Sequence, residues 1–208
     1  MSPPRVVVLD YGSGNIRSAQ RALERVGADV TVTADSELAF EADGLVVPGV
    51  GAFAACMAGL QAVDGPKTVR RRTTQARPVL GICVGMQILF ESGDEHGVRT
   101  AGCGEWPGHV RRLHASVLPH IGWNTVEAAA GSDLLRGVED ERFYFVHSYA
   151  LTRWPGPEGP AHALAGWTEH GERFVSVLEG SFLAATQFHP EKSGDAGATV
   201  LENWLAGL

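Results

Sequence analysis

The sequence predicts an α/β fold with a doubly wound, mostly parallel sheet flanked by helices and extra strands in the second half. Short, continuous apolar runs recur in the first half, as expected for parallel strands covered on both faces, at residues 6–9, 45–47 and 79–82. Apolar residues from Ile16 to Val26 follow helical spacing, and Gly27 then ends the predicted helix. This alternation of strands and helices predicts βαβ units.

The second half of the chain is richer in candidate strands. They are expected at residues 110–113, 143–146, 174–178 and 182–188, before a final helix at 196–205. Residues 92–109 lose their periodicity among five glycines and Pro107, which predicts a long loop. A helix is expected from Met86 through Phe90. The 208 residues are enough for one substantial core, so we expect a single domain over residues 1–208.

Composition narrows the classes of function. The net charge of −7 argues against nucleic acid as a partner. Pro48 and four glycines interrupt the uncharged stretch 44–60, and the N-terminus lacks a signal-peptide pattern, so we expect no membrane span and a cytoplasmic protein. The basic cluster is most simply a solvated helix face and consists of Lys67, Arg70, Arg71, Arg72 and Arg77.

We expect neither a cofactor nor a metal. Cys56, Cys83 and Cys103 form no CxxC pair, and the histidines form no HExxH motif. The glycines near residue 12 invite a dinucleotide interpretation, but the third glycine of that motif would fall on Arg17.

A cysteine stands at the end of an apolar strand in the segment 81–85, which reads GICVG. This pattern is typical of a nucleophile elbow, in which a sharp strand-to-helix turn strains the nucleophile and brings its neighbours against other chain segments. Glycines suit those crowded positions. The helix that follows favours the thiolate of Cys83. The alternative is a buried core thiol.

The tripeptide His189-Pro190-Glu191 supplies a base and a carboxylate. Pro190 favours an extended conformation for His189, so the two side chains can project to the same side. A Cys–His–Glu set repeats the logic of a catalytic triad, in which the imidazole takes the thiol proton and the carboxylate orients the ring. The alternative is a surface turn with a solvated Glu191.

A glycine-rich segment, PGVGAF at residues 48–53, follows another predicted strand. Its backbone N–H groups can approach a reacting carbonyl. We therefore expect Gly49 or Val50 to donate to an oxyanion, beside the N–H of Val84. An ordinary glycine turn is the alternative.

Together, the elbow, the HPE tripeptide and the glycine segment resemble the class I glutamine amidotransferases. The resemblance implies hydrolysis of the glutamine side-chain amide by Cys83, His189 and Glu191. It also implies that Gln87 and Gly51 bind the substrate L-glutamine. Gln87 would otherwise be an ordinary glutamine on a helix surface.

Over nearly its full length the chain is similar to the glutaminase subunits of imidazole glycerol phosphate synthase. The matching blocks are LDYGSGN at 9–15, PGVGAF at 48–53, PHIGWN at 119–124, YFVHSY at 144–149 and HPEKSG at 189–194. The chain departs from the usual pattern at Val84, where leucine is common, and at Cys103, where an apolar residue is common.

This second resemblance implies a partner for the chain. The partner would be a (β/α)₈-barrel cyclase subunit in a 1:1 heterodimer, which uses the ammonia to make imidazole glycerol phosphate and an aminoimidazole carboxamide ribotide. The residues implied to face this barrel are Ser13, Asn15, Trp123, Asn124, Tyr144 and Lys192. Capping, turn or core roles are the alternatives, and for Tyr144 a core role has equal standing. At the level of the whole chain, the alternatives are a cysteine hydrolase on a similar scaffold and a non-catalytic regulatory subunit.

Overall fold

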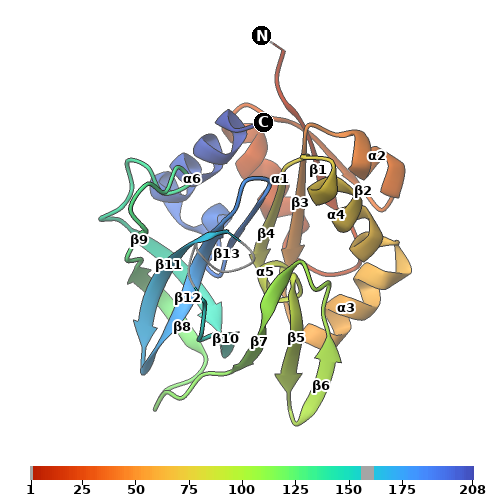
Figure 1. Ribbon diagram of the computed structural model, residues 1–208. Coiled ribbons are helices and arrows are strands. Elements are labelled where there is room, and N and C mark those ends of the chain that lie inside the picture. Colours follow the sequence, from red (N-terminus) through yellow and green to blue (C-terminus); the bar gives the residue numbers. More distant parts are fainter. Residues whose placement is uncertain (1, 156–161) are drawn as a thin grey trace.

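The computed structural model describes residues 2–155 and 162–208. Its centre is a seven-stranded sheet in the order β11-β12-β13-β4-β3-β1-β2 (Figure 1). The strands are β1 (Arg5–Leu9), β2 (Asp29–Thr33), β3 (Gly44–Gly49), β4 (Val79–Cys83), β11 (Leu164–His170), β12 (Glu172–Glu179) and β13 (Leu183–Thr186). The five strands from β13 to β2 pair in parallel, and β12 and β11 extend the sheet in antiparallel pairing. The predicted fold class is confirmed.

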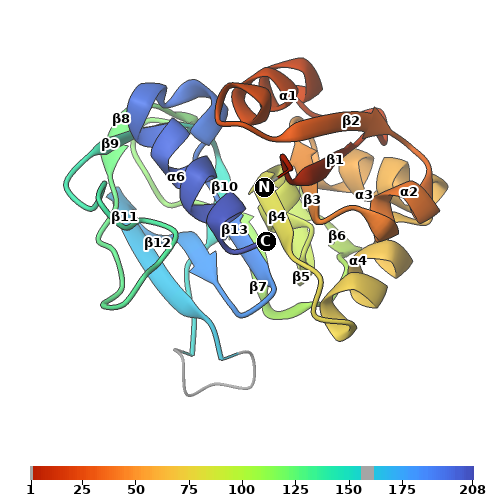
Figure 2. The same ribbon diagram turned by 90° about the horizontal axis from the view of Figure 1, so that it is seen from above.

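Helices cover both faces of this sheet (Figure 2). One face carries α1 (Ile16–Arg25) and α6 (Gly194–Ala206), and the other carries α3 (Phe53–Ala62) and α4 (Gly65–Thr74), with α2 (Ser36–Glu41) against α4. Every residue of β3 and β4 is buried. This double covering explains why the central strands are continuous apolar runs instead of alternating ones.

A second sheet and a hairpin lie beside the carboxyl ends of β3 and β4 (Figure 1). The sheet has the order β10-β7-β5-β6, with β5 (Phe90–Glu95), β6 (Val98–Ala101), β7 (Trp106–Arg112) and β10 (Tyr149–Leu151). The hairpin pairs β8 (His120–Thr125) with β9 (Arg142–His147). These elements add walls to the edge of the main sheet where its parallel strands end.

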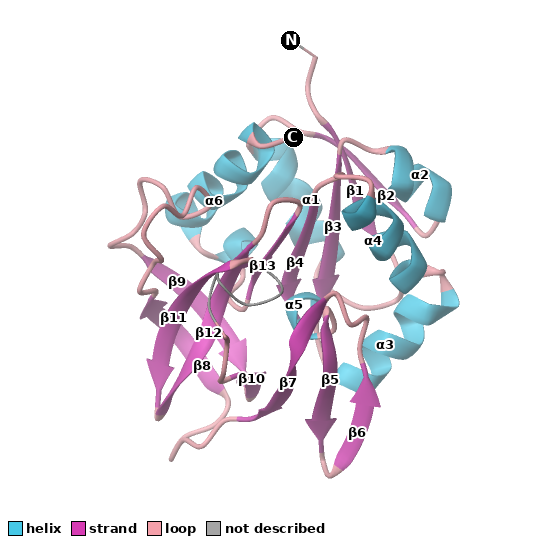
Figure 3. Ribbon diagram, in the orientation of Figure 1, coloured by secondary structure: helices cyan, strands magenta, loops and turns pink. Residues whose placement is uncertain are grey.

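The prediction of a long loop over residues 92–109 was wrong, because this segment contains most of β5, all of β6 and the start of β7 (Figure 3). Two of its glycines, Gly93 in β5 and Gly102 just after β6, serve close packing. A Cβ on Gly93 would come within 2.7 Å of the Phe53 ring, and one on Gly102 within 2.1 Å of the Phe90 carbonyl oxygen. Glycine therefore marks tight contact here, which the sequence pattern does not distinguish from a turn.

The helix predicted from Met86 through Phe90 was too long. The helix α5 spans only Val84–Gln87, and Phe90 already begins β5. All residues from Val84 to Phe90 are buried, so the segment has no polar face whose period could reveal where the helix ends.

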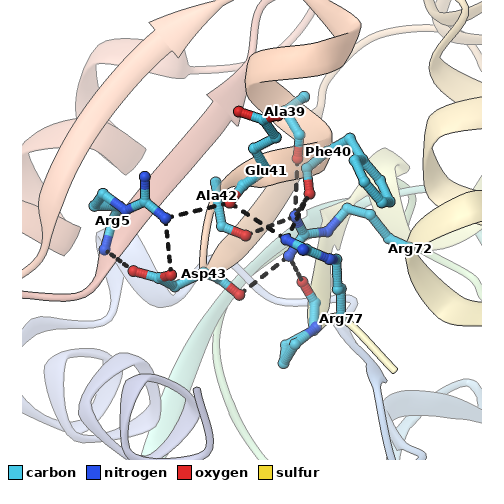
Figure 4. A network of polar contacts seen from close by, with 9 residues as sticks. Arg5, Ala39, Phe40, Glu41, Ala42, Asp43, Arg72 and Arg77 are labelled. Atoms are coloured by element: carbon cyan, nitrogen blue, oxygen red, sulfur yellow. Dashed lines mark hydrogen bonds and ion pairs between the residues drawn. The ribbon is translucent and has the colours of Figure 1, made fainter. Parts of the chain in front are cut away.

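The basic cluster on α4 is not simply a solvated face, because Arg72 is fully buried. Its guanidinium donates hydrogen bonds of 2.8–3.1 Å to five backbone carbonyls, those of Ala39, Phe40, Ala42, Asp43 and Pro78 (Figure 4). Burial lowers the pKa of Arg72 to about 10, which leaves it charged at neutral pH. The planar fork of donors thus satisfies carbonyls at the end of α2 that the helix itself leaves unpaired.

None of the helices in the described part of the chain is long and apolar enough to cross a membrane.

Candidate active site

Cys83 occupies a strained turn between β4 and α5. Its backbone has φ 57° and ψ −113°, a conformation that non-glycine residues rarely adopt. The neighbouring glycines permit this turn: a Cβ on Gly85 would lie 1.9 Å from the Val47 carbonyl oxygen, and one on Gly81 would lie 2.8 Å from Leu89. The turn directs the Cys83 thiol into a pocket at the end of β4.

His189 reaches the same pocket from the adjacent strand. β13 pairs in parallel with β4, and three residues after β13 the chain comes to His189. Its Nδ1 atom lies 2.7 Å from the Glu191 carboxylate. Both side chains are almost fully buried, so Glu191 is not the solvated residue of a surface turn. Because a carboxylate accepts, Nδ1 carries the proton and Nε2 is left for a second partner.

The electrostatics of His189 favour proton transfer from sulfur. Burial lowers its pKa, but the interactions with Cys83 and Glu191 outweigh burial and raise the pKa to about 9. Within the described residues, the buried Nε2 atom has no hydrogen-bond partner of normal length. A base with a raised pKa and an uncommitted Nε2 atom beside a thiol can take its proton.

The other two cysteines, Cys56 and Cys103, are not placed for proton transfer to His189. Burial raises the pKa of Cys56, and it raises the pKa of Cys103 to about 12. Neither thiol lines the pocket that holds His189. Cys83 is therefore the cysteine placed for nucleophilic chemistry.

The pocket has a volume of about 180 Å³ and is lined by Cys83, His189 and Gln87, among others. Gln87 is buried rather than a helix-surface residue, and its amide nitrogen donates to the carbonyl of Tyr149 at 2.8 Å and to Gln187 at 3.0 Å. The predicted substrate-binding Gly51 lines the same pocket. The space suits a small, polar substrate.

The predicted oxyanion donors come together at the elbow. β3 pairs Gly49 with Cys83, and a Cβ on Gly49 would lie 2.4 Å from the backbone nitrogen of Gly85. Val84 is the first residue of α5, where helix N–H groups lack helical acceptors. The N–H of Val50, however, points to the Ser13 hydroxyl at 3.3 Å. That N–H must leave Ser13 before it can serve an oxyanion.

The six residues predicted to face a partner differ in what their side chains contact. Trp123 is 52% exposed and packs edge-on against Tyr144, whose ring lies 5.8 Å from the Lys192 ammonium. Ser13, by contrast, binds the Val50 carbonyl at 2.8 Å, and Asn124 binds the Glu169 carbonyl at 3.0 Å. Asn15 stands at the N-cap of α1, and its side chain makes no capping hydrogen bond.

Sequence reasoning missed several residues of this site. The pocket is also lined by Glu95, His147 and Tyr149, and Gln187 lies 3.8 Å from the Cys83 sulfur. His147 and Tyr149 belong to the YFVHSY block, whose position after a predicted strand was a usable signal. Glu95 stood in the segment predicted to be a loop, where no periodicity marked it.

Comparisons with known proteins identify the family of this chain. A family model described as "Glutamine amidotransferase class-I" matches residues 7–208. The chain belongs to the class I glutamine amidotransferase family. Solved structures of this fold include one described as a glutamine amidotransferase, with 20% identity and a TM-score of 0.74, covering 98% of this chain and 99% of the other. PurLQS from Thermotoga maritima has 18% identity and a TM-score of 0.73, with 99% of each chain covered.

Within the class I amidotransferases, curated relatives share much more sequence with this chain. The imidazole glycerol phosphate synthase subunits HisH of Mycobacterium bovis and Nocardia farcinica are each 63% identical to it, and 100% of both chains is covered in each case. The HisH subunit of Thermobifida fusca is 60% identical, with 99% of each chain covered. This amidotransferase chain therefore belongs to the HisH group, as its sequence blocks predicted.

Proposed function

We propose that this chain is the glutaminase subunit of imidazole glycerol phosphate synthase, which hydrolyses L-glutamine to glutamate and ammonia. The observation that carries the proposal is that Cys83 and His189 line one pocket together with Gln87, while the buried Glu191 carboxylate pairs with His189. The high identity to HisH subunits over the full chain supports it independently.

The geometry supports a mechanism in two stages. His189 Nε2 takes the proton of the Cys83 thiol, and the sulfur attacks the δ-carbonyl carbon of glutamine. As the tetrahedral intermediate collapses, the C–N bond breaks, the imidazolium returns its proton to the leaving nitrogen, and ammonia departs. A water molecule, deprotonated by His189, then attacks the thioester and releases glutamate and the free thiol.

The pocket walls suggest how glutamine is oriented. Lys192 and Glu95 are both among its lining residues, so the walls offer charges of both signs to the carboxylate and ammonium of an amino acid. One Glu95 oxygen accepts the Phe53 N–H at 2.7 Å, which fixes the carboxylate and leaves its other oxygen for an ammonium group.

The ammonia needs an acceptor site, and we propose that a (β/α)₈-barrel cyclase subunit supplies it in a 1:1 heterodimer. The product would be imidazole glycerol phosphate, together with an aminoimidazole carboxamide ribotide. We assign the face that includes Trp123, Tyr144 and Lys192 to this contact, because it joins an exposed aromatic ring to a cation beside the pocket. A biosynthetic role of this kind places the protein in the cytoplasm.

Replacement of the nucleophile tests the reaction. Cys83→Ala is expected to abolish glutamine-dependent synthesis in the complex with the cyclase, while added ammonium salts still support synthesis. The two rates are measured side by side by following formation of imidazole glycerol phosphate. Cys103→Ala is a matched control, since this thiol lies outside the pocket lining, and it should retain glutamine turnover. Glutamine turnover by Cys83→Ala would contradict the nucleophile assignment.

The contact between Val50 and Ser13 predicts that the isolated chain is nearly idle. The Val50 N–H and carbonyl both engage the Ser13 hydroxyl, and the Cys56 thiol also contacts that carbonyl at 3.3 Å. Loss of one oxyanion donor costs about 10²–10³-fold in rate. Ammonia release should therefore rise by about this factor when the cyclase and its ligand are added, and equal rates would rule out gating at Val50.

A further inference from the structure

A chain of buried side chains connects the β8–β9 hairpin to the pocket. The His120 Nδ1 atom lies 3.2 Å from His147 Nε2, and His147 Nδ1 lies 3.0 Å from the Tyr149 carbonyl oxygen. Both histidines are buried, and His147 and Tyr149 line the pocket. The mechanism proposed above uses neither the His120 ring nor the His147 ring.

The donor and acceptor of each hydrogen bond in this series follow from its two end groups, the Tyr149 carbonyl and the Asn124 amide. A carbonyl can only accept, so His147 Nδ1 carries a proton and its Nε2 accepts the Nδ1–H of His120. His120 Nε2 is then an acceptor for the Asn124 amide at 3.3 Å. The same amide nitrogen donates to the Glu169 carbonyl at 3.0 Å, which fixes the orientation of the amide. The donors thus run in one direction, from Asn124 toward Tyr149.

At the pocket end, the Tyr149 carbonyl holds Gln87. It accepts one N–H of the Gln87 amide at 2.8 Å, and the other N–H goes to Gln187 Oε1 at 3.0 Å. Both amide hydrogens of Gln87 are therefore committed to the protein, and its Oε1 atom remains as an acceptor in a residue that lines the pocket.

The surroundings of the two histidines keep the rings neutral and in place. The His120 ring stacks on Phe145 and on His170, with centroids 4.9 and 4.2 Å apart, and His147 meets the Phe174 ring edge-on at 4.8 Å. Burial lowers the pKa of His120 to about 4 and that of His147 to about 3. A second proton on either ring would set two N–H groups against each other or against the Asn124 amide.

We propose that His120 and His147 are positioning residues for the glutamine substrate: their hydrogen-bond chain holds the Tyr149 carbonyl and thereby presents Gln87 Oε1 as the acceptor for a substrate N–H. This proposal rests on the proposed glutaminase function. It assigns the two histidines a role in substrate binding that is separate from proton transfer at Cys83.

The first test needs no substitution. Histidine selectively labelled with ¹⁵N in the complete chain, bound to its cyclase subunit, reports the tautomer of each ring by long-range ¹H–¹⁵N correlation. We expect His120 and His147 both as neutral Nδ1–H tautomers at pH 7, unlike free histidine, which favours the Nε2–H form. An Nε2–H tautomer or a charged ring at either position would contradict the proposed series of hydrogen bonds from Asn124 to Tyr149.

The second test compares variants that keep or remove the donor. His147→Phe retains ring packing but loses the hydrogen bond to Tyr149, and it should raise the KM for glutamine by about tenfold with kcat nearly unchanged. His147→Asn places an amide N–H near the Nδ1 position and should recover most of this loss. A fall in kcat alone, or equal KM values for the Phe and Asn variants, would contradict the positioning role.

Two controls separate this inference from the proposed function. His114→Phe, at an exposed histidine outside the pocket, should leave KM unchanged. Alkylation of Cys83 by iodoacetamide should proceed equally in wild type and His147→Phe, which verifies an intact elbow. A wild-type complex that hydrolyses no glutamine would overturn the proposed function, whereas normal wild-type turnover with an unchanged KM in His147→Phe would overturn only the positioning role.

Discussion

At the scale of single residues, Glu191 is unusual because almost its whole side chain is buried, with one carboxylate oxygen bound to His189. Among the described residues, its second oxygen is buried without a partner. Burial of a carboxylate in such a place costs free energy unless the carboxylate is paired with a neighbouring group. We therefore propose that Glu191 holds the His189 tautomer whose Nε2 is left for the Cys83 thiol.

Glu191→Gln tests this function. The amide preserves shape but can offer an N–H to Nδ1, which favours the wrong tautomer, so kcat should fall by about 10²–10⁴-fold. The measurement is steady-state glutamine hydrolysis in the complex. Glu202→Gln, an exposed carboxylate on α6, is the control and should leave kcat unchanged. A loss of less than threefold in Glu191→Gln would show that the carboxylate does not orient the ring.

The residues of the candidate triad could be predicted because their chemistry is written in short, contiguous motifs. Cys83 stands between glycines after an apolar strand, and His189 and Glu191 are two positions apart. The partners of Gln87 could not be predicted in this way. Gln187 and Tyr149 meet it only through pairing of β13 with β4 and of β10 with β7, which brings together residues 62 and 100 positions apart.

At the scale of secondary-structure elements, Arg72 joins three parts of the chain. Its five acceptors belong to the end of α2, the turn before β3 and the residue before β4, while Arg72 itself lies on α4. The guanidinium therefore replaces the water that would otherwise satisfy these carbonyls.

Removal of Arg72 should destabilise the fold. Arg72→Met retains the aliphatic stem but removes the guanidinium from five carbonyls, three of which it meets in fully buried contacts, so we expect the free energy of unfolding to fall by about 3–5 kcal/mol. Urea unfolding monitored by circular dichroism measures this change. Lys67→Met on the same helix, at an exposed position, should change it by less than about 0.5 kcal/mol. Similar values for the two variants would mean that Arg72 is replaceable by an apolar side chain.

The same contrast shows which elements the sequence could reveal. The parallel strands β1, β3 and β4 were evident because burial on both faces demands unbroken apolar runs, whereas the edge strand β2, which is not buried, was missed. The strands β5 and β6 were missed because Glu91, Asp94 and Arg99 occupy them. Gly93 in β5 and Gly102 just after β6 pack closely against Phe53 and Phe90, but in the sequence they look like turn residues. Arg72 looked like its exposed neighbours because nothing in a run of arginines indicates which one faces inward.

At the scale of the whole molecule, the pocket is assembled from segments that are far apart in the sequence. β4 supplies Cys83, the chain after β13 supplies His189, and the β9–β10 segment supplies His147. The hydrogen bonds of His120 and His147 extend from the β8–β9 hairpin to the Tyr149 carbonyl at the pocket. Stability of the whole fold should therefore respond to the charge state of two buried rings.

This coupling predicts how stability changes with pH. The folded-state pKa values of His120 and His147, about 4 and about 3, lie below the ordinary value of 6.5. As pH falls below 6.5, these two histidines take up protons in the unfolded chain but not in the folded chain. The free energy of unfolding therefore falls, through His120 until about pH 4 and through His147 until about pH 3. His120→Phe removes one such group and should make this slope shallower, by at most about 1.4 kcal/mol per pH unit near pH 5.

Urea unfolding at pH 7, 6 and 5 provides the measurement. His114→Phe is the matched control, because this histidine is exposed in the folded chain, and its slope should equal that of wild type. If His120→Phe also retained the wild-type slope, the buried rings would be charged in the folded protein, contrary to their burial.

Arg72 also affects which amino-acid substitutions the surrounding segments can accept. Every hydrogen bond that it makes ends on a backbone oxygen, so it constrains the path of residues 39–43 and 78 but not the identity of their side chains. Side-chain substitutions at residues 39–43 and 78 can therefore accumulate, in evolution or by design, as long as the backbone keeps the same path. If α4 were transferred to another protein, in contrast, residues 39–43 and 78 would have to be transferred with it. Without their carbonyls the buried guanidinium of Arg72 would have no hydrogen-bond acceptors.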